Sequence, residues 1–552
     1  MIAHSLWREF RSGFFLIRNG SSCSPAALRS CFRHGSYILC LGIALPATGF
    51  AQSQPQTQVA EDRARLGNST PLLNQTDPAT VRDSERARHD AQQKADGDSD
   101  RLDTSGNLLG DMWGARSWLY KHGITLDIQE FDELWGNATG GTPSGMDGNG
   151  GTGSGTGAAY DGVTMPTLTV DLDKLFGLKG GLFNISALQI RGRSISQDHL
   201  GNFNPISGFE ADRSTRLFEL WYQQSFLNDR LDVKIGQQDL DTEFLISGYG
   251  AMYLNANFGW PMAPSVNLYA GGPSWPLASP AVRIRYRPGE QFTFMFAAAD
   301  DNPPGNRSNT FGIQNGGNRA DPTNQTTNDG SGTRFNMGTG ALLMTELQYA
   351  INPQPADMPE AAKDPGLPGV YKLGGLYDTA QFPDYRYNNQ GVALGGPDDT
   401  THMPRWDRGN WIVYGIIDQM LWRPSLTSAR SVGLFARATG NGGDRNLISF
   451  AIDAGLSLKA PFNGRDDDTL GLGWGIGRAS SGLRQYDRNT GSLVQGNENH
   501  LELTYQAQIM PWLVMQPDFQ YVWHPGGGVG DWTGVRRIGD EAVFGLHSNI
   551  VF

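Results

Sequence analysis

Polar and charged side chains recur at every second position along several apolar segments of this 552-residue chain. In Leu188–Arg193, for example, Leu and Ile alternate with Gln and Arg. Because alternate residues of a strand point to opposite faces, we expect the polar members to share one face that borders a water-filled space. The side chains that we expect to contact a solute there are Arg191, Arg193, Glu219, Trp221, Lys234, Arg283, Arg285, Glu346, Arg437 and Asp453.

This set mixes cationic side chains with carboxylates. A passage lined by one sign of charge would select ions, so the mixture favours a neutral solute. Arg guanidinium groups and carboxylates can both bond hydroxyl groups, and Arg does so with a fixed fork geometry. Trp221 adds a flat face on which a solute could stack. The alternative for each residue is an ordinary wet side chain that forms a salt bridge with a neighbouring strand.

Bond-making chemistry has little support in the sequence. All three cysteines, Cys23, Cys31 and Cys40, lie near the amino terminus, which argues against a thiolate nucleophile or metal site in the rest of the chain. The nine histidines show no metal-ligand spacing, and neither a Ser-His-Asp order nor a phosphate loop is readable. Asp466–Asp468 could bind Ca²⁺, but a solvated turn is the simpler interpretation. We expect no enzyme, no cofactor and no metal.

The elements that must position these side chains are β-strands. In Leu501–Ile509 every second residue is apolar, and Glu502, Thr504, Gln506 and Gln508 lie between them. The same alternation runs through Leu513–Trp523 and Ala542–Phe552. Over about ten residues this period of two is typical of a strand with lipid on one side and water on the other.

Sixteen such strands can be placed between Gly123 and Phe552. They are expected at 123–135, 160–173, 182–193, 215–225, 231–238, 281–287, 291–299, 340–350, 369–378, 411–422, 431–438, 447–459, 469–478, 501–509, 513–523 and 540–552. The connections alternate between mostly short turns, such as Phe226–Arg230, and mostly long loops, such as Asp239–Pro280. Transmembrane barrels show this asymmetry, and an even strand count places both termini in the periplasm.

The fold class predicted is therefore all-β, a transmembrane sixteen-stranded antiparallel barrel with a short helical or disordered periplasmic segment before it. Closure gives every backbone group a partner inside the bilayer and removes sheet edges. Tryptophans near predicted strand ends suit the interfacial girdles of such a barrel; they are Trp411, Trp422, Trp512 and Trp523. A secreted β-sandwich shares the period of two, but it does not predict the alternating loop lengths.

One long loop, Asp239–Pro280, is rich in aromatic residues. Phe258, Trp260, Tyr269 and Trp275 lie within it. We expect that this loop could fold into the barrel as a constriction. The alternative is a surface loop that packs on a neighbouring element.

The amino-terminal region divides into two parts. Residues 1–51 carry five arginines before the apolar stretch Tyr37–Phe50, which is too short to span a membrane. We interpret them as a signal peptide cleaved after Ala51; a membrane anchor is the alternative. Residues 52–107 are polar and charged, which predicts a disordered periplasmic tail. The net charge of −12 makes the chain a poor nucleic-acid binder.

Residues 108–552, the predicted barrel, resemble the OprB-type carbohydrate-selective porins. The segments that carry the resemblance, in order, are Leu109–Arg116, Gly123–Leu126, Glu133–Asn137, Glu219–Ser225, Asn257–Pro261, Leu367–Gly375, Asp418–Trp422, Gly433–Arg437, Asp444–Leu447, Asp466–Gly473 and Leu501–Tyr505. The resemblance implies a sixteen-stranded outer-membrane barrel with sugar-selective diffusion. The charged tail and the Gly-rich stretch Ala138–Ala159 depart from the family pattern.

The function expected is passive diffusion of small, glucose-like sugars through the bacterial outer membrane. One alternative is a structural or assembly barrel whose tail, residues 52–104, binds a periplasmic partner. Another is a secreted glycoside hydrolase with paired carboxylates, which would require a soluble fold. The expected partners are sugars and outer-membrane lipid; the sequence does not decide between a monomer and a homo-oligomer.

Overall fold

The computed structural model describes residues 104–142, 155–303, 329–335, 337–353, 364, 366–426, 428–531 and 534–552. The predicted signal peptide and residues 52–103 of the predicted tail lie outside these ranges. Every element described below belongs to one compact unit of the chain. Within the described ranges, no helix combines the length and apolar character needed to cross a membrane.

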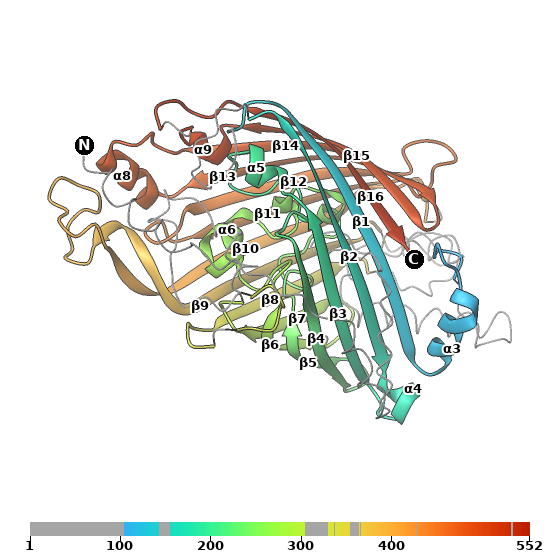
Figure 1. Cartoon of the computed structure of the whole chain (residues 1–552). Helices are drawn as coiled ribbons and strands as arrows, with labels where there is room; N and C mark the ends of the chain where they lie inside the picture. Colours follow the sequence, from blue (N-terminus) through green and yellow to red (C-terminus); the bar gives the residue numbers. More distant parts are fainter. Residues whose placement is uncertain are drawn as a thin grey trace, which may run out of the picture. The chain divides into compact units, whose positions relative to one another are not determined.

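Sixteen antiparallel strands form a closed barrel in which each strand pairs with its sequence neighbours and β1 pairs with β16 (Figure 1). Their bounds are β1 Ile124–Thr139, β2 Gly157–Asp171, β3 Gly181–Gly192, β4 Ser214–Phe226, β5 Leu231–Gln238, β6 Ser279–Tyr286, β7 Phe292–Ala299, β8 Leu342–Ile351, β9 Gly369–Asn388, β10 Pro404–Trp422, β11 Ser431–Asn441, β12 Ile448–Lys459, β13 Thr469–Ala479, β14 Asn497–Met510, β15 Leu513–Trp523 and β16 Glu541–Val551.

The sixteen-stranded barrel predicted from the alternation is confirmed. The clearest difference is at β9 and β10, which continue about ten and seven residues beyond their predicted outer ends. These extensions pair with each other, as in Trp406 opposite Pro383 and Pro404 opposite Asn388. Exposed residues of these extensions, such as the paired Gln381 and Arg408, are polar, so the apolar outer face that identifies a lipid-facing strand is missing there.

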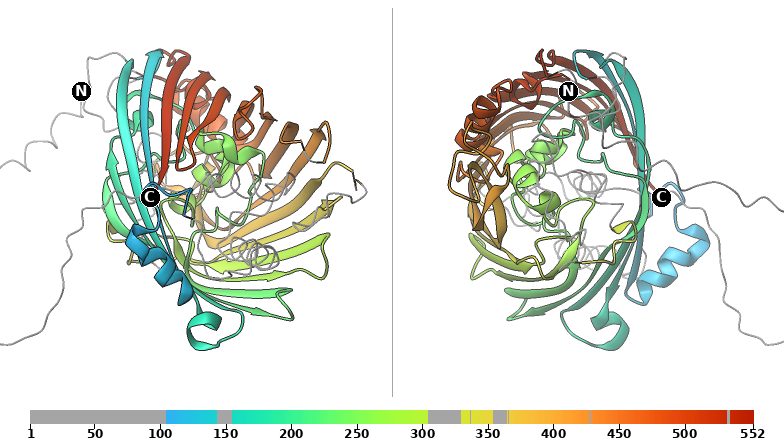
Figure 2. Two further views of the ribbon diagram at one scale, coloured as in Figure 1. Left: turned by 90° about the vertical axis from the view of Figure 1, so that its right-hand side faces the viewer. Right: turned by 60° about the vertical axis from the view of Figure 1, so that its left-hand side comes forward.

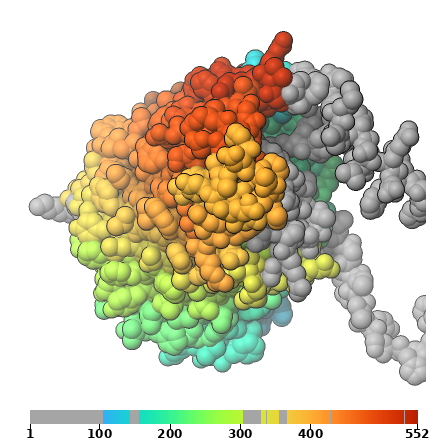
Figure 3. Space-filling view, turned by 90° about the vertical axis from the view of Figure 1, so that its left-hand side faces the viewer, coloured from blue at the N-terminus to red at the C-terminus, as the bar shows by residue number. Residues whose placement is uncertain are grey.

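Short helices occupy the ends of the barrel and the loops (Figure 1). They are η2 Met112–Gly114, α3 Ala115–Lys121, α4 Leu172–Phe176, α5 Ile195–His199, η3 Gly250–Met252, η4 Ala256–Phe258, α6 Met262–Asn267, η5 Tyr269–Gly271, α8 Ser481–Thr490 and α9 Pro525–Gly528. Figure 3 looks onto the end of the barrel that carries α8, where residues of the carboxy-terminal half, in orange and red, form the upper part of the face.

The two faces of the wall differ as the alternation predicts. Leu503 and Phe544 point outward and keep 45% and 55% of their surface exposed, as expected of side chains that meet lipid. Glu502, which adjoins Leu503, and His547, three residues after Phe544, lie on the other face and are buried in the interior. The interior is therefore polar over much of its wall, and it is filled by more than water.

Two long loops fold into the interior (Figure 2). One connects β3 to β4 (residues 193–213), and the other connects β5 to β6 (residues 239–278). Apolar side chains of the second loop, including Leu240, Phe244 and Trp260, pack against inward residues of the wall, among them Met295, Met344 and Tyr414. Burial of each large side chain contributes about 1.5–3 kcal/mol, so this packing holds the loop inside. The predicted inward fold of the aromatic loop is confirmed.

Candidate functional site

The β3–β4 and β5–β6 loops contact each other inside the barrel. The amide of Gly208 donates to the carbonyl of Leu254 (2.9 Å), and the amide of Ala256 donates to the carbonyl of Pro205 (3.3 Å). Two segments that belong to different hairpins thus form one internal surface. Because this surface lies inside the barrel, its anchors and its cavities define the candidate site.

Ion pairs fix the first part of the β5–β6 loop to the wall. Glu243 of the loop pairs with Lys234 on β5 and, at 2.5 Å, with Arg283 on β6. All three side chains are at most 1% exposed. Two strand cations face one loop carboxylate in a dry environment, where removal of one partner leaves an uncompensated charge.

Wall residues farther round the barrel continue this anchoring. Glu346 on β8 accepts from the Leu245 amide (3.2 Å) and from the Tyr414 hydroxyl (2.7 Å). Asp418 on β10 accepts from the Ser247 hydroxyl (2.5 Å), and Lys372 on β9 donates to the Ile246 carbonyl (2.8 Å). Side chains of the wall therefore bond the backbone of this short loop segment, which would otherwise be buried with unsatisfied groups.

Arg437 on β11 forms the most extensive anchor. Its Nε donates to Asp453 on β12 (2.7 Å), and its two terminal nitrogens donate to three loop carbonyls, those of Leu245, Gly259 and Asn257. Asn257 in turn donates to Asp453 (2.9 Å). The guanidinium thus ties two parts of the loop to one point on the wall.

The opposite part of the wall anchors both loops. Glu502 on β14 accepts from the amides of Leu254 (2.7 Å) and Asn255 (2.9 Å). Gln520 on β15 donates to the Ile206 carbonyl of the β3–β4 loop (2.9 Å) and accepts from the Asn255 side chain (2.8 Å). The two loops therefore cross the interior and are tied at both sides.

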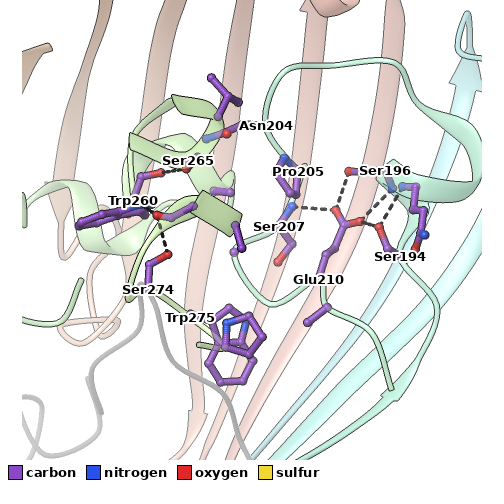
Figure 4. Close-up of a pocket in the computed structure, with 18 of the residues that line it drawn as sticks. Ser194, Ser196, Asn204, Pro205, Ser207, Glu210, Trp260, Ser265, Ser274 and Trp275 are labelled. Atoms are coloured by element: carbon purple, nitrogen blue, oxygen red, sulfur yellow. Dashed lines mark hydrogen bonds between the residues drawn. The ribbon is translucent and has the colours of Figure 1, made fainter. Parts of the chain in front are cut away.

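A pocket lies between the two loops (Figure 4). It holds about 970 Å³ of space, part of it open to solvent. Polar groups come from Ser194, Ser196, Asn204, Ser207 and Glu210 of the β3–β4 loop, and Trp260, Trp275 and Asp241 come from the β5–β6 loop. Hydroxyl, amide and carboxylate groups beside two indole rings are the combination that binds a polyhydroxylated ring.

Several polar atoms of the pocket lining have no hydrogen-bond partner in the protein. They are both amide atoms of Asn204, Oδ1 of Asp241 and the indole nitrogen of Trp275. Asn204 and Asp241 are each 3% exposed, so they are almost fully withdrawn from solvent. Buried polar groups are normally bonded, so partners for these atoms must come from the pocket itself.

Glu210 organises the wall of the pocket nearest α5. Its carboxylate accepts from the Ser194 hydroxyl, from the amide and hydroxyl of Ser196 (both 2.8 Å), and from the Ser207 amide (3.0 Å), as Figure 4 shows. Burial raises the pKa of Glu210, and these hydrogen bonds oppose that shift. Because they occupy its oxygens, Glu210 positions the loop.

Asp241 lies at the other side of the pocket. Burial is the main cause that raises its pKa to about 7, and the hydrogen bond from the Trp275 amide opposes the rise. The Trp275 amide donates to its Oδ2 (3.0 Å), which leaves Oδ1 toward the pocket. Among the described residues, no group of three or more His, Cys, Asp or Glu has an arrangement that could hold a metal ion.

The structure corrects the predicted placement of Arg191. Leu188 and Ile190 of β3 point inward, where they pack with Trp275 and Phe218, so Arg191 points to the outer face. The prediction that it lines the lumen is wrong because this part of the interior is filled by an apolar loop rather than by water. Arg193 lies at the end of β3 and pairs with Asp198 of α5 (2.7 Å).

Trp221 does point inward, but it does not present a free face. It is 1% exposed, packs with Leu182 and lies 4.8 Å beneath the Lys234 ammonium. Glu219 is also inward and accepts from the Asp239 amide (3.2 Å), and Arg285 pairs with Asp232 (2.8 Å). None of the ten predicted residues lines the pocket, so their contact with a solute stays a prediction.

Trp260 and Trp275 belong to the aromatic loop predicted from the sequence, whereas Asn204, Glu210 and Asp241 were not among the predicted residues. These three lie in segments without alternation, so strand periodicity could not find them. The stretch Ser194–Ser207 contains several Ser and Asn residues, but such residues are common in any loop and therefore gave no distinct signal.

Comparison with known proteins gives consistent matches. The model of the family described as "Carbohydrate-selective porin, OprB family" matches residues 155–552. Porin B of Pseudomonas aeruginosa is 26% identical over 471 residues, which cover 81% of this chain and 91% of that protein. The putative porin QuiX of Acinetobacter baylyi is 24% identical over 472 residues, which cover 81% and 93%.

A solved structure has the same fold. The structure of Pseudomonas putida OprB at high pH superposes with a TM-score of 0.65 at 21% identity. The alignment covers 82% of this chain and 99% of that one. The family match spans β2 to β16 of the described barrel, so the fold and the match point to one kind of outer-membrane protein.

Proposed function

The chain belongs to the OprB family of carbohydrate-selective porins, and we propose that the sugars it admits are recognised in the pocket between the β3–β4 and β5–β6 loops. The chain is a carbohydrate-selective outer-membrane porin, and the barrel provides the water-filled route. The pocket, the indoles and the unpartnered polar atoms beside them support this site for selectivity.

The observation that carries the proposal is that the Trp275 indole and the Asn204 amide both line this pocket, set well apart from each other in the view of Figure 4. An indole face suits the C–H face of a sugar ring, and a primary amide can donate to one hydroxyl while it accepts from the next. The buried amide of Asn204 has no partner in the protein. A sugar hydroxyl can therefore bond it without first breaking a hydrogen bond within the protein.

We propose that several of the ten residues predicted from alternation act by holding the β5–β6 loop, not by contacting sugar. Those that bond the β5–β6 loop or pair with its anchors, such as Lys234, Arg283, Glu346, Arg437 and Asp453, position the loop. Binding in a passive porin must remain weak enough for release, so rigid positioning matters more than many contacts. No catalytic step is needed, and cleavage after Ala51 and a partner for residues 52–104 stay predictions.

Planar-bilayer recordings of Asn204→Ala test the site. We expect a saturable block of the current by glucose-like sugars in the original chain, and at least a fivefold weaker apparent affinity in the variant. Asn441→Ala is the matched control, because the Asn441 amide also lacks a partner but does not line the pocket. Equal sugar affinity of the original chain and Asn204→Ala would refute this site and leave the porin assignment untouched.

A further inference from the structure

Two helical elements lie at one end of the barrel and take no part in its wall. One is the segment with η2 and α3 that precedes β1, and the other is the connection with α4 between β2 and β3. The short β4–β5 turn lies at the same end, and short turns face the periplasm in outer-membrane barrels. In the right-hand view of Figure 2, α3 lies outside the ring of strands. The segment is therefore placed beside the wall at its periplasmic end.

Hydrogen bonds fix the segment before β1 to the end of β16. The Leu108 amide donates to the Val551 carbonyl (2.8 Å), and the Asn107 side chain donates to the Phe552 carbonyl (2.9 Å). Arg116 of α3 is buried, and its guanidinium donates to the same Phe552 carbonyl. The position of α3 beside the barrel is therefore set by the wall itself.

The two helical elements contact each other. The Lys174 ammonium of α4 lies 4.3 Å from the centroid of the Tyr120 ring of α3. The Asp171 amide donates to the Gly123 carbonyl (2.6 Å), which joins the residues that follow α3 to those that precede α4. Residues 104–123 and 171–180 thus form one continuous surface, which we call the helical patch.

Large apolar side chains of the helical patch point into open space. Trp113 is 100% exposed, Trp118 60% and Phe176 76%. Leu109 and Leu178 are exposed as well. Apolar surface gathered in this way marks a site of interaction with protein or membrane, and indole rings are enriched where a membrane meets water.

The backbone at Trp113 is strained. Its φ of 58° and ψ of 33° lie in the left-handed region, and Met112 before it has a φ of 48°. Bulky residues seldom adopt this conformation, because the side chain crowds the backbone. The strain holds an indole that is fully exposed, so packing within the described chain does not explain it. A partner outside the chain does.

The charges of the helical patch indicate which partner. Its charged side chains in the exposed class are all cationic, namely Lys121, Lys174 and Lys179. The carboxylates are less exposed, and that of Asp111 is occupied by the amide (2.8 Å) and the hydroxyl (2.9 Å) of Ser117. Lysines around exposed aromatic rings complement a surface that is apolar inside and anionic at its boundary.

We propose that the helical patch binds the periplasmic leaflet of the outer membrane, with its aromatic rings among the lipid headgroups and its lysines on anionic phospholipid. The patch continues the lipid-facing surface of the wall. Phe226, at the end of β4, points outward and is 47% exposed, and the Ser225 amide beside it donates to the Gly180 carbonyl (2.9 Å). The patch therefore begins where the apolar belt of the barrel ends.

This inference extends the porin assignment and does not depend on the sugar site. Residues 52–103 of the chain, or a periplasmic protein, would cover the same surface in other ways. Each would give a different product in the first test below.

Site-specific photo-crosslinking in intact outer membranes identifies what covers the helical patch. A benzophenone side chain at Trp118 is expected to give the mass of the chain plus one phospholipid. The matched control is Met403, which is 55% exposed in the β9–β10 connection at the other end of the barrel and should give no phospholipid adduct. A crosslink from Trp118 only within the chain or only to another protein, or no crosslink at all, would overturn the proposal.

Hydrogen exchange of the full chain in vesicles tests the part played by charge. The His122 and Gly123 amides, which donate to carbonyls of α3, should exchange at least fivefold more slowly in equal parts of phosphatidylglycerol and phosphatidylcholine than in phosphatidylcholine alone. The triple variant Lys121→Gln, Lys174→Gln and Lys179→Gln should lose this difference.

Arg465→Gln is the matched control for the lysine variant. Arg465 lies in the β12–β13 turn and is already paired with Asp468 (2.7 Å), so its removal should leave the difference between the vesicles unchanged. Equal exchange of the original chain in both vesicles, or a difference that survives in the lysine variant, would overturn the proposal. Sugar block measured on the same samples separates this outcome from failure of the porin assignment.

Discussion

Arg437 and Asp453 form an ion pair of 2.7 Å between β11 and β12, and the β5–β6 loop lies directly over it. Both side chains are at most 1% exposed. The same guanidinium donates to loop carbonyls at Leu245 and Gly259. The pair therefore couples the membrane wall to the element that narrows the interior, and its removal should change conduction as well as stability.

Arg437→Ala is expected to loosen the β5–β6 loop. The change leaves Asp453 buried without its cation, at a cost of about 3–5 kcal/mol, and frees three loop carbonyls. Single-channel conductance should rise and sugar block should weaken. Arg478→Ala on β13, an exposed position, is the control. Unchanged conductance in Arg437→Ala would show that this anchor does not hold the loop.

Glu243→Gln is expected to act through the same loop from its other end. It removes the carboxylate that faces both Lys234 and Arg283, so two buried cations lose their partner. The measurement is the free energy of unfolding together with current noise in bilayers. We expect a lower thermal midpoint and more frequent current fluctuations than in Glu290→Gln, which changes an exposed residue of the β6–β7 turn.

The carboxyl of Asp241 should make the stability of the β5–β6 loop depend on pH. Its pKa is raised from 3.8 to about 7 in the folded protein, mainly by burial. A carboxyl whose folded pKa is raised stabilises the folded loop fully below pH 3.8 and loses that contribution as the pH rises through about 7. Hydrogen exchange of the Trp275 amide, which donates to Asp241, should be faster at pH 8 than at pH 5.

Asp241→Asn is the control for that measurement, since it keeps the shape and removes the titration. In the variant, any remaining pH dependence of protection, after correction for the intrinsic exchange rate, should be small. The same dependence in both proteins would show that another group is responsible.

Trp221→Phe should leave sugar block within about twofold of the original value. The indole is 1% exposed and covered by Lys234, so no sugar can stack on it in this arrangement. Titration of the block with glucose in planar bilayers checks this. A loss of sugar affinity comparable to that of Asn204→Ala would show that Trp221 does contact the sugar and that Lys234 moves off its ring.

The strands could be predicted from the sequence because lipid and water impose opposite chemistry on neighbouring residues. Leu503 between Glu502 and Thr504 shows that rule directly. The rule failed at Arg191, where the interior is occupied by Trp275 from a distant loop and the outer face is polar. Local alternation reports which residues share a face, but it does not say what fills the space on each side.

The pocket could not be predicted because contacts far apart in the sequence create it. Glu502 bonds the Leu254 amide across 248 residues, and Gln520 bonds the Ile206 carbonyl across 314. Such pairs leave no periodic signal. Only the aromatic composition of the β5–β6 loop suggested that it folds inward.

The central claim is that selectivity for sugars arises where the two loops meet inside the barrel. The most direct measurement is a planar-bilayer titration that compares glucose with sorbitol, a linear polyol of nearly the same size. We predict that glucose blocks the current in a saturable manner at a concentration at least tenfold below that needed for sorbitol. Equal block by both solutes would contradict recognition of the sugar ring and leave only a size-limited pore.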